Sequence, residues 1–264
     1  MLQNALEVVK RLIVNADDYG RTPGVNAGVL EAHAGGIVTS ATVLVLEKSA
    51  ARGIREASEK APGLGLGLHF AVTGGGSPAA PAGSLPTLAP RGVFARSREA
   101  LPERIPEAEV RAELEAQIEV FQMLARKPPT HLDSHHHAAL HPAIAPVFAA
   151  VARERGFPVR AASEEARRAL RAAGVATPDR FLDGFYAEGA TAAALERLLG
   201  GVGPGVTELM CHPARVDEDL RKGSRYADER DWEREILCDP AIRRRLRELD
   251  VALVGFDALP RRMR

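Results

Sequence analysis

Short apolar runs alternate with longer amphipathic segments along most of the chain. Seven runs have the length and composition of buried strands: 11–15, 38–45, 64–70, 130–135, 157–161, 206–212 and 251–256. Three segments between them have helical periodicity: 24–36, 107–127 and 230–249. Two glycines end the first of these, and Pro240 predicts a break into two helices within the last. Alternating strands and helices predict a parallel sheet that helices cover.

Seven strands in 264 residues fit one large α/β domain. We expect a (β/α) barrel, closed or nearly closed, and a doubly wound open sheet is the alternative. The chain shows no internal repeat and no interdomain linker, which predicts a single domain over 1–264 with its core at about 11–257. The segment 71–92 is rich in Gly, Pro and Ser and is long for a loop. Such a loop is either a functional lid or disordered, and we interpret it as an active-site loop.

Composition excludes few classes but favours a small-molecule partner. Lys plus Arg and Asp plus Glu both number 35, so the formal net charge is zero, which argues against nucleic acid and against a polybasic membrane contact. No uncharged apolar run approaches the ~20 residues that span a membrane. Charged residues at Glu7, Lys10 and Arg11 interrupt the first apolar stretch and argue against a signal peptide. The two cysteines, Cys211 and Cys238, lack CxxC spacing, and we expect a cytoplasmic protein.

Four of the predicted strands carry an acid or a histidine at their carboxyl ends. These residues are Asn15, Asp17 and Asp18 after the first strand, His69 after the third, Asp133 and His135 at the fourth, and Glu208 and His212 on the strand at 206–212. Active sites of parallel α/β folds gather at this end of the sheet. The pattern therefore predicts that these side chains share one site.

Asp17 and Asp18 are compatible with two interpretations. The sequence Asp-Asp-Tyr-Gly is ordinary turn or helix-capping chemistry. Paired carboxylates after a buried strand also divide labour well, because one ligates a metal while the other acts as a general base. Because adjacent strand residues diverge, we expect one to face the site while the other turns toward its surroundings.

The stretch THLDSHHHAALHP, residues 130–142, holds five of the eight histidines. If the strand continues through it, His135 and His137 share one face and His136 takes the other, so at most two of the three point into one site. We therefore interpret His136 as structural. His141 stands before Pro142, either as a helix-start residue or in a functional role.

One aspartate with two histidines suits a catalytic divalent metal. A mixed nitrogen and oxygen donor set fits Zn, Mn, Co, Ni or Fe, whereas Mg is less natural with two imidazoles. Taken alone, a histidine such as His69 is more often a core residue. Its position at the same end of the sheet as Asp18 and His135 favours a role as a metal ligand. His212 is a candidate general acid, since imidazole titrates near neutrality. Cys211 faces the other way and is interpreted as a small buried hydrophobe, because a Cys/His nucleophile pair fits poorly on adjacent strand residues.

These motifs resemble those of the YdjC-like carbohydrate deacetylases, which include chitooligosaccharide deacetylases and hopanoid-associated relatives. The segments are LIVNADDYGRTPGVNAGVLEAHAGGIVTSATVLV, GLGLHF, THLDSHHH and ELMCHPA, in order from about residue 11 to 257. The resemblance implies a deformed (β/α) barrel that removes N-acetyl groups from short amino sugars. It implies Asp18, His69 and His135 as ligands of one divalent ion, Mg by family resemblance, and Asp17 as the general base. His212, or alternatively His137, would protonate the leaving amine.

The same resemblance extends to SRYADERDWEREIL through Ser224, Tyr226, Arg230 and Glu233. The residues expected to bind the carbohydrate are Asn15, Tyr19, Glu208, Ser224, Tyr226 and Arg230. The sequence departs from the family at Ala139, where members often have a third alternating histidine, and at Arg234, where a Leu is common. A homo-oligomer such as a homodimer is expected for a barrel of this size. The rival hypotheses are a metal-dependent phosphoesterase or other amidohydrolase, and a non-catalytic sugar-binding protein.

Overall fold

A computed structural model describes residues 9–259 as one α/β domain. The strands are β1 Lys10–Tyr19, β2 Ser40–Val43, β3 Gly65–Phe70, β4 Leu132–Ser134, β5 Arg180–Leu182, β6 Gly205–Cys211 and β7 Val251–Leu253. The α-helices are α1 Pro23–Ala34, α2 Ala50–Lys60, α3 Glu107–Ala125, α4 Ala145–Arg155, α5 Glu164–Ala172, α6 Ala192–Gly200, α7 Glu218–Gly223, α8 Asp228–Cys238 and α9 Pro240–Glu248. The ends of the expected 1–264 domain lie outside the described residues.

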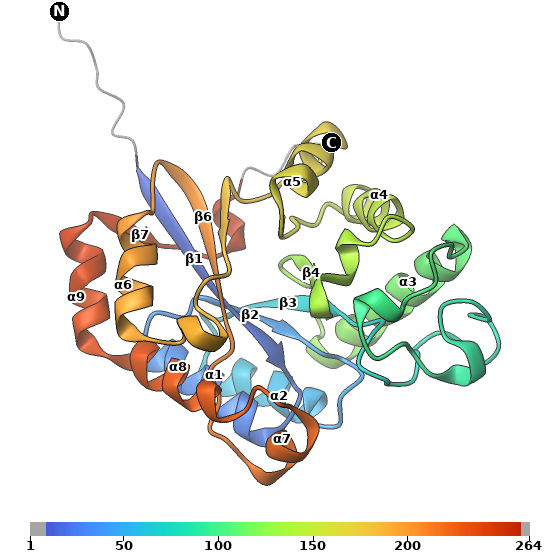
Figure 1. Ribbon diagram of the computed structural model, residues 1–264, viewed down its shortest axis with the longest axis horizontal. Coiled ribbons are helices and arrows are strands. Elements are labelled where there is room, and N and C mark those ends of the chain that lie inside the picture. The colour runs from blue at the N-terminus through green and yellow to red at the C-terminus, as the bar shows by residue number, and fades with distance from the viewer. Residues whose placement is uncertain (1–8, 260–264) are drawn as a thin grey trace, which may run out of the picture.

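All strand pairs in the sheet are parallel, in the order β4-β3-β2-β1-β6-β5, and β7 pairs with the start of β1. The long strand β1 runs through the middle of the molecule (Figure 1). Its first half pairs with β7 and its second half with β2, while β6 follows its other edge. The parallel arrangement brings the carboxyl ends of the strands to one side of the fold, as the polar residues at those ends predicted.

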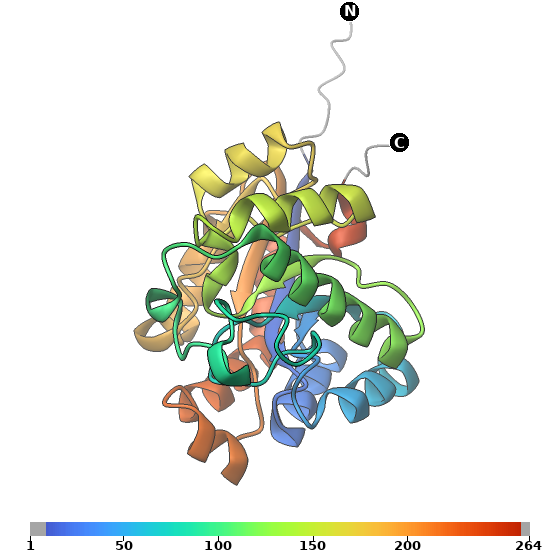
Figure 2. The same cartoon turned by 90° about the vertical axis from the view of Figure 1, so that its right-hand side faces the viewer.

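The curled sheet is an incomplete barrel. No strand pairing joins β4 to β5 within residues 9–259. Val159 extends the β4 edge by a single bridge to Leu132, and its N–H donates to the Ala176 carbonyl at 2.9 Å. Helices cover the outside, and α3 and α4 lie side by side on the face that Figure 2 presents. The expected (β/α) barrel is therefore confirmed, in the form of a deformed barrel that is not fully closed.

A stacked pair of rings fills the amino-terminal side of the sheet near β3. The imidazole of His131 lies 3.5 Å, centroid to centroid, from the Phe256 ring, with an angle of 6° between the planes. A Cβ at Gly67 would lie 2.3 Å from His131 Cε1, so only glycine leaves room for this ring. Burial lowers the pKa of His131 to about 3, so it is a neutral core residue. His131 thus belongs to the core and is separate from the other histidines of its run.

Most of the predicted elements are confirmed, with two differences. The three helical segments form α1, α3 and the pair α8 and α9, which meet at Pro240. The predicted strand at 157–161 is wrong beyond the single bridge at Val159, and Pro158 in this run lacks an N–H. The sequence analysis did not predict β5, because Arg180–Leu182 is short and its first residue is exposed. Within residues 9–259, no helix is long and apolar enough to cross a membrane.

The segment 71–92 is held against α3. The backbone N–H groups of Ala79 and Ala80 donate to Glu113 at 3.0 and 2.9 Å, and those of Thr87 and Leu88 donate to Glu109 at 2.9 and 2.8 Å. Both glutamates are buried. These four bonds anchor the middle of the segment to α3.

Candidate metal centre and catalytic site

Two consecutive aspartates at the end of β1 both line one cavity of about 670 Å³. The β1–β2 register shifts between Ala16 and Tyr19, and Asp18 has a left-handed φ of 67°. This irregularity turns the backbone so that Asp17 and Asp18 face the same side. The expectation that one of them would turn away is therefore wrong, because regular strand alternation ends before Asp18. Left-handed backbone in a residue other than glycine costs free energy, and at a cavity lined by polar groups it is consistent with a functional role.

Asp18, His69 and His135 bring three ligand atoms together at the carboxyl ends of β1, β3 and β4. Asp18 Oδ1 lies 3.5 Å from His69 Nε2 and 3.1 Å from His135 Nδ1, and the two imidazole nitrogens are 3.3 Å apart. An ion with ligand distances of about 2.1 Å in tetrahedral geometry separates its ligands by roughly 3.4 Å. The three residues expected to hold a metal therefore form a triangle of suitable size.

Asp133 fixes the orientation of His69. The Nδ1–H of His69 donates to Asp133 Oδ1 at 2.6 Å, which leaves the lone pair of Nε2 directed at Asp18 and His135. Burial opposes a charged imidazole, but Asp133 and the nearby carboxylates raise the pKa of His69 to about 10. The site thus favours a positive charge at this position, for which a divalent ion competes with a proton.

Arg160 is the functional residue that the sequence analysis missed. Its guanidinium is buried and donates to both oxygens of Asp17 at 2.6 and 2.7 Å and to Glu208 Oε1 at 2.7 Å, and it lies 2.9 Å from Asp133 Oδ2. The only sign of its role in the sequence is that one arginine stands within the apolar run 157–161. One positive charge therefore serves three buried carboxylates.

Although they share Arg160, Asp17 and Glu208 have pKa values that shift in opposite directions. Burial raises the pKa of Asp17, but two hydrogen bonds with Arg160 outweigh it and hold this pKa well below its usual range. Glu208 receives one bond, its other oxygen has no partner among the described residues, and burial raises its pKa to about 7. A second trio of possible ligands, Asp17, His69 and Asp133, is less suited to a metal because Arg160 already occupies its carboxylates.

Arg230 orients the ligand Asp18. Its Nη2 donates to Asp18 Oδ2 at 2.6 Å, which leaves Oδ1 for the two histidines. Burial raises the pKa of Asp18, but Arg230 and His135 lower it by more, so the carboxylate is ionised. The Arg230 Nε donates to the Tyr226 carbonyl at 2.9 Å, and its buried Nη1 has no partner among residues 9–259. This nitrogen is available to a ligand in the cavity.

The histidine run does not follow strand alternation. Strand β4 ends at Ser134, and His136 and His137 both have a left-handed φ of 52°. As a result, His135, His136 and His137 all line the cavity, and the expectation that at most two of them could do so is wrong. His136 stacks on His135 with ring centroids 3.9 Å apart and contacts the Thr73 hydroxyl at 3.1 Å. His141 accepts the Ala143 N–H at 3.2 Å near the start of α4, so it is a helix-start residue.

His212 enters the cavity from the end of β6, beside a buried glutamate. Its backbone N–H donates to Glu233 Oε2 at 2.5 Å, and its Nδ1 lies 3.8 Å from Glu233 Oε1. The Tyr226 hydroxyl also donates to Glu233. Burial, followed by the charge of Arg230, lowers the pKa of His212 to about 3, while burial raises the pKa of Glu233 to about 8. His212 is therefore neutral, with its ring held beside the metal triangle.

The six predicted carbohydrate contacts fall into two groups. Ser224, Tyr226 and Arg230 line the cavity. Asn15, Tyr19 and Glu208 are fully buried behind its wall and are not part of the lining. Asn15 Nδ2 donates to Asp17 Oδ1 at 2.9 Å, the Tyr19 hydroxyl donates to the Gly53 carbonyl at 2.7 Å, and Glu208 binds Arg160. The prediction that these three contact the substrate directly is therefore wrong, because their side chains are fully buried and do not reach the cavity lining.

The structure also locates Cys211 and the two positions that depart from the family pattern, Arg234 and Ala139. Cys211 is buried, and its thiol lies 3.4 Å from the Asn15 carbonyl, as expected for a small core residue. Arg234 pairs with Glu31 at 3.2 Å and with Asp231 at 2.7 Å, and so links α8 to α1. Ala139 does not line the metal cavity.

Comparisons with known proteins agree with this arrangement. The model of the YdjC-like protein family matches residues 11–248. The chain is 38% identical over 246 residues to a carbohydrate deacetylase of Geobacillus stearothermophilus, covering 92% of this chain and 96% of the relative. It is 37% identical over 259 residues to a chitooligosaccharide deacetylase of Serratia marcescens, covering 95% and 99%.

Two solved structures share the fold. An Enterococcus faecalis protein whose description names cellobiose-phosphate cleavage has a TM-score of 0.89 at 33% identity, over 95% of this chain and 98% of that one. A family 4 carbohydrate esterase from Streptomyces lividans has a TM-score of 0.50 at 12% identity, over 94% and 95%, which is a likeness of fold alone. With the family model matching most of its length and relatives above one-third identity, this chain belongs to the YdjC-like family.

Proposed function

We propose that the protein is a metal-dependent deacetylase that hydrolyses N-acetyl groups on amino sugars or short chitooligosaccharides. The observation that carries the proposal is the convergence of Asp18, His69 and His135 in one cavity that also holds Asp17 and His212. The relatives named carbohydrate and chitooligosaccharide deacetylases support the substrate class. The cavity thus combines a possible ligand set for a metal with a carboxylate and an imidazole for proton transfer.

The donor set fits one divalent ion. Two imidazole nitrogens and one carboxylate oxygen face a common point, and Asp133 and Arg230 hold two of these ligands from behind. When bound, a divalent ion would supply Lewis acidity for the acetyl carbonyl and would lower the pKa of a water molecule. Three protein ligands leave open positions for substrate and water, which is typical of catalytic sites.

Asp17 is the general base in this proposal. Its Oδ1 accepts from Arg160 and Asn15, whereas its Oδ2 accepts only from Arg160 among the described residues. One lone pair of Oδ2 therefore remains for the proton of the attacking water. Its low pKa makes Asp17 a weak base, which is sufficient only for a water already acidified in the site. The water oxygen forms the new bond to the acetyl carbon.

His212 delivers the proton to the leaving nitrogen as the carbon–nitrogen bond breaks. Burial lowers the pKa of the ring, so His212 is neutral at rest. In this proposal it takes up the proton released from the attacking water and passes it to the amine nitrogen. His137 is the alternative donor and also lines the cavity. His212 is favoured because Glu233 fixes its backbone and lies beside its ring. The products are acetate and the free amino sugar.

The rim of the cavity is basic. Arg21, Arg96, Arg98 and Arg225 all contribute to its lining. Guanidinium groups bind phosphate and carboxylate well, so an amino sugar with an anionic substituent should bind better than a neutral one. This second substrate form is tested by comparing kcat/KM for N-acetylglucosamine and N-acetylglucosamine 6-phosphate. A higher value for the phosphate that is lost in Arg225→Gln would support it.

The proposal also includes the metal, the assembly, the location and the loop. We infer Mg as the native ion from the family resemblance, although two imidazoles also suit Zn, Co, Ni or Mn. We also infer a homo-oligomer, such as a homodimer, a cytoplasmic location and a role for the 71–92 segment in covering the sugar. Gly74 of this segment lines the cavity.

Metal analysis combined with an acetate-release assay on N-acetylglucosamine oligomers tests the function. Asp18→Asn and His69→Ala should lose both bound metal and activity. Asp17→Asn should keep the metal and lose activity, because its oxygen is needed for proton transfer. Asp219→Asn serves as the matched control, since Asp219 is an exposed aspartate of α7 that does not line the cavity. Full activity in a metal-free variant would refute the proposal.

The rival functions need two further substrates. A phosphoesterase would hydrolyse p-nitrophenyl phosphate in preference to the N-acetyl sugar, and another amidohydrolase would prefer simple amides. A sugar-binding protein would bind chitobiose in its metal-loaded form without releasing acetate. Each of these results would replace the deacetylase proposal.

A further inference from the structure

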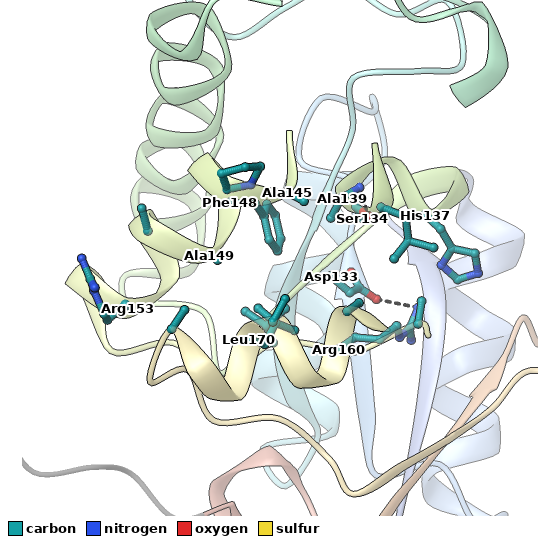
Figure 3. A pocket seen from close by; sticks show the side chains of 18 residues that line it. Asp133, Ser134, His137, Ala139, Ala145, Phe148, Ala149, Arg153, Arg160 and Leu170 are labelled. Carbon is teal, nitrogen blue, oxygen red and sulfur yellow. Dashed lines mark hydrogen bonds and ion pairs between the residues drawn. The ribbon is translucent and has the colours of Figure 1, made fainter. Parts of the chain in front are cut away.

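A second cavity, of about 450 Å³, lies between α4 and α5, where the barrel is incomplete. Figure 3 shows its lining, with Phe148 and Ala149 from α4, Leu170 from α5, and Asp133 and Arg160 at one side. The cavity is separate from the metal site but shares Ser134 and His137 with it. Ligand-binding cavities are commonly 300–1,000 Å³ and mainly apolar, with few polar groups.

Small side chains keep this cavity open. The lining includes Ala145, Ala149 and Ala150 from α4, Ala166 and Ala169 from α5, and Ala173 directly after α5. Residues 166–173 span about 10 Å at 1.5 Å per residue, so the apolar surface is an elongated strip. The cavity is open to solvent, and its alanines are partly or fully exposed, so a ligand that covers them removes apolar surface from water. An elongated apolar space suits a linear aliphatic chain.

The inner end of the cavity offers little to a polar ligand group. The Asp133 carboxylate accepts from His69 and Thr42 and pairs with Arg160, and Ser134 Oγ accepts the Ala139 N–H at 2.9 Å. Figure 3 places Arg160 and His137 at this end. A ligand would therefore direct its apolar end inward and its polar end toward the opening.

The opposite end of the lining carries a positive charge. Arg153, in the last turn of α4, is exposed, and Figure 3 places it far from His137. Its neighbour Glu154 already accepts two hydrogen bonds from Arg111, at 2.8 and 3.1 Å. Arg153 also lowers the pKa of Glu154. The exposed Arg153 guanidinium has five N–H donors and can pair with a further carboxylate at the mouth.

We propose that the cavity between α4 and α5 binds a linear aliphatic carboxylate of medium length. The chain lies between the alanine faces of the two helices, and its carboxylate pairs with Arg153. This site is independent of the deacetylase proposal, because none of its alanines takes part in the metal centre. It is also distinct from the sugar cavity, although the two share a wall at His137.

Isothermal titration of the full-length protein with octanoate, decanoate and decanol tests the site. Decanoate should bind saturably, and roughly tenfold more tightly than octanoate, because each buried methylene adds to the affinity. Arg153→Gln should weaken decanoate severalfold and leave decanol unchanged. The double variant Ala149→Leu/Ala166→Leu fills the cavity and should abolish binding of both, while its melting temperature stays at or above that of the parent.

The control is Ala51→Leu, which makes the same change on an exposed position of α2 and should bind as the parent does. Binding that is undetectable in the parent, or equal in the parent and the filled variant, would overturn the proposal. A third result would also overturn it: the filled variant raising the KM for an octyl glycoside of N-acetylglucosamine while decanoate binding is unchanged. The chain would then be part of the sugar substrate.

Discussion

Replacing Asp133 by Asn removes no atom from the metal triangle, yet we expect it to weaken metal binding. Asp133 Oδ1 accepts the His69 Nδ1–H at 2.6 Å, and Asp133 Oδ2 accepts from Thr42 at 3.0 Å and lies 2.9 Å from Arg160. Three donors thus meet two acceptor oxygens. An asparagine has only one oxygen, and its NH2 group must face at least one of these donors.

The amide oxygen will face Arg160 and Thr42, because two donors, one of them charged, lie on that side. The NH2 group then faces His69 Nδ1, which has to become an acceptor. The ring proton moves to Nε2, the atom 3.5 Å from Asp18 Oδ1 that would otherwise bind the metal. Loss of such a partner typically reduces metal affinity ten- to hundredfold, equivalent to about 1.4–2.7 kcal/mol.

The assay is chelator competition for Zn²⁺ and Mn²⁺ at fixed pH, with circular dichroism to verify the fold. Asp183→Asn makes the same chemical change at an aspartate of the cavity that makes no contact with His69, and its affinity should equal that of the parent. An Asp133→Asn affinity within twofold of the parent would refute the tautomer argument. It would show that His69 can keep its Nε2 lone pair without this carboxylate.

Three further predictions concern buried residues. Gly67→Ala should destabilise the fold by about 1–3 kcal/mol in urea unfolding, because the new Cβ would meet the His131 ring at 2.3 Å. Glu208→Gln should remove a pH dependence of the unfolding free energy. In the folded protein the pKa of Glu208 is about 7, above its ordinary value of 4.5. The stability that this group contributes is therefore complete below pH 4.5 and is lost as the pH rises through 7, by an amount on the order of a few kcal/mol. Glu233→Gln should reduce kcat roughly tenfold or more with little change in melting temperature, since Glu233 contacts the backbone and ring of His212, the proposed proton donor.

A specific result would contradict each of these three predictions. Gly200→Ala is the control for Gly67, as nothing lies within 4 Å of a Cβ there, and equal unfolding midpoints for the two variants would contradict the steric argument. Parallel stability curves for the parent and Glu208→Gln between pH 4.5 and 7.5 would show that Glu208 stays ionised. A Glu233→Gln enzyme with parental kcat and an unchanged pH profile would show that Glu233 serves folding alone.

The candidate ligands could be read from the sequence because parallel strands place their carboxyl ends at one edge. Asp18, His69 and His135 each follow or end an apolar run, and the topology brought the three runs together. The ligand types followed from donor chemistry. Helix breaks such as Pro240 were also predictable, since they depend on the local backbone alone.

The direction of individual side chains could not be read in the same way. Alternation along a strand predicted opposite faces for Asp17 and Asp18, and for His136 and His137. Left-handed backbone at Asp18, His136 and His137 changed both predictions. Nothing in those residue types requires this conformation, which the surrounding structure imposes.

The sequence by itself determined the parallel α/β architecture, the edge of the sheet where polar side chains gather and three candidate metal ligands, because hydrophobic periodicity and donor chemistry are local properties. Only the tertiary structure decided that Arg160 neutralises Asp17 and Asp133, that Arg230 orients Asp18, and that alanines of α4 and α5 leave a cavity between them. Arg160 and Asp17 are 143 positions apart, and Arg230 and Asp18 are 212 apart. Such pairs form only when the folded chain removes their charges from water together, and no periodicity in the sequence records that proximity.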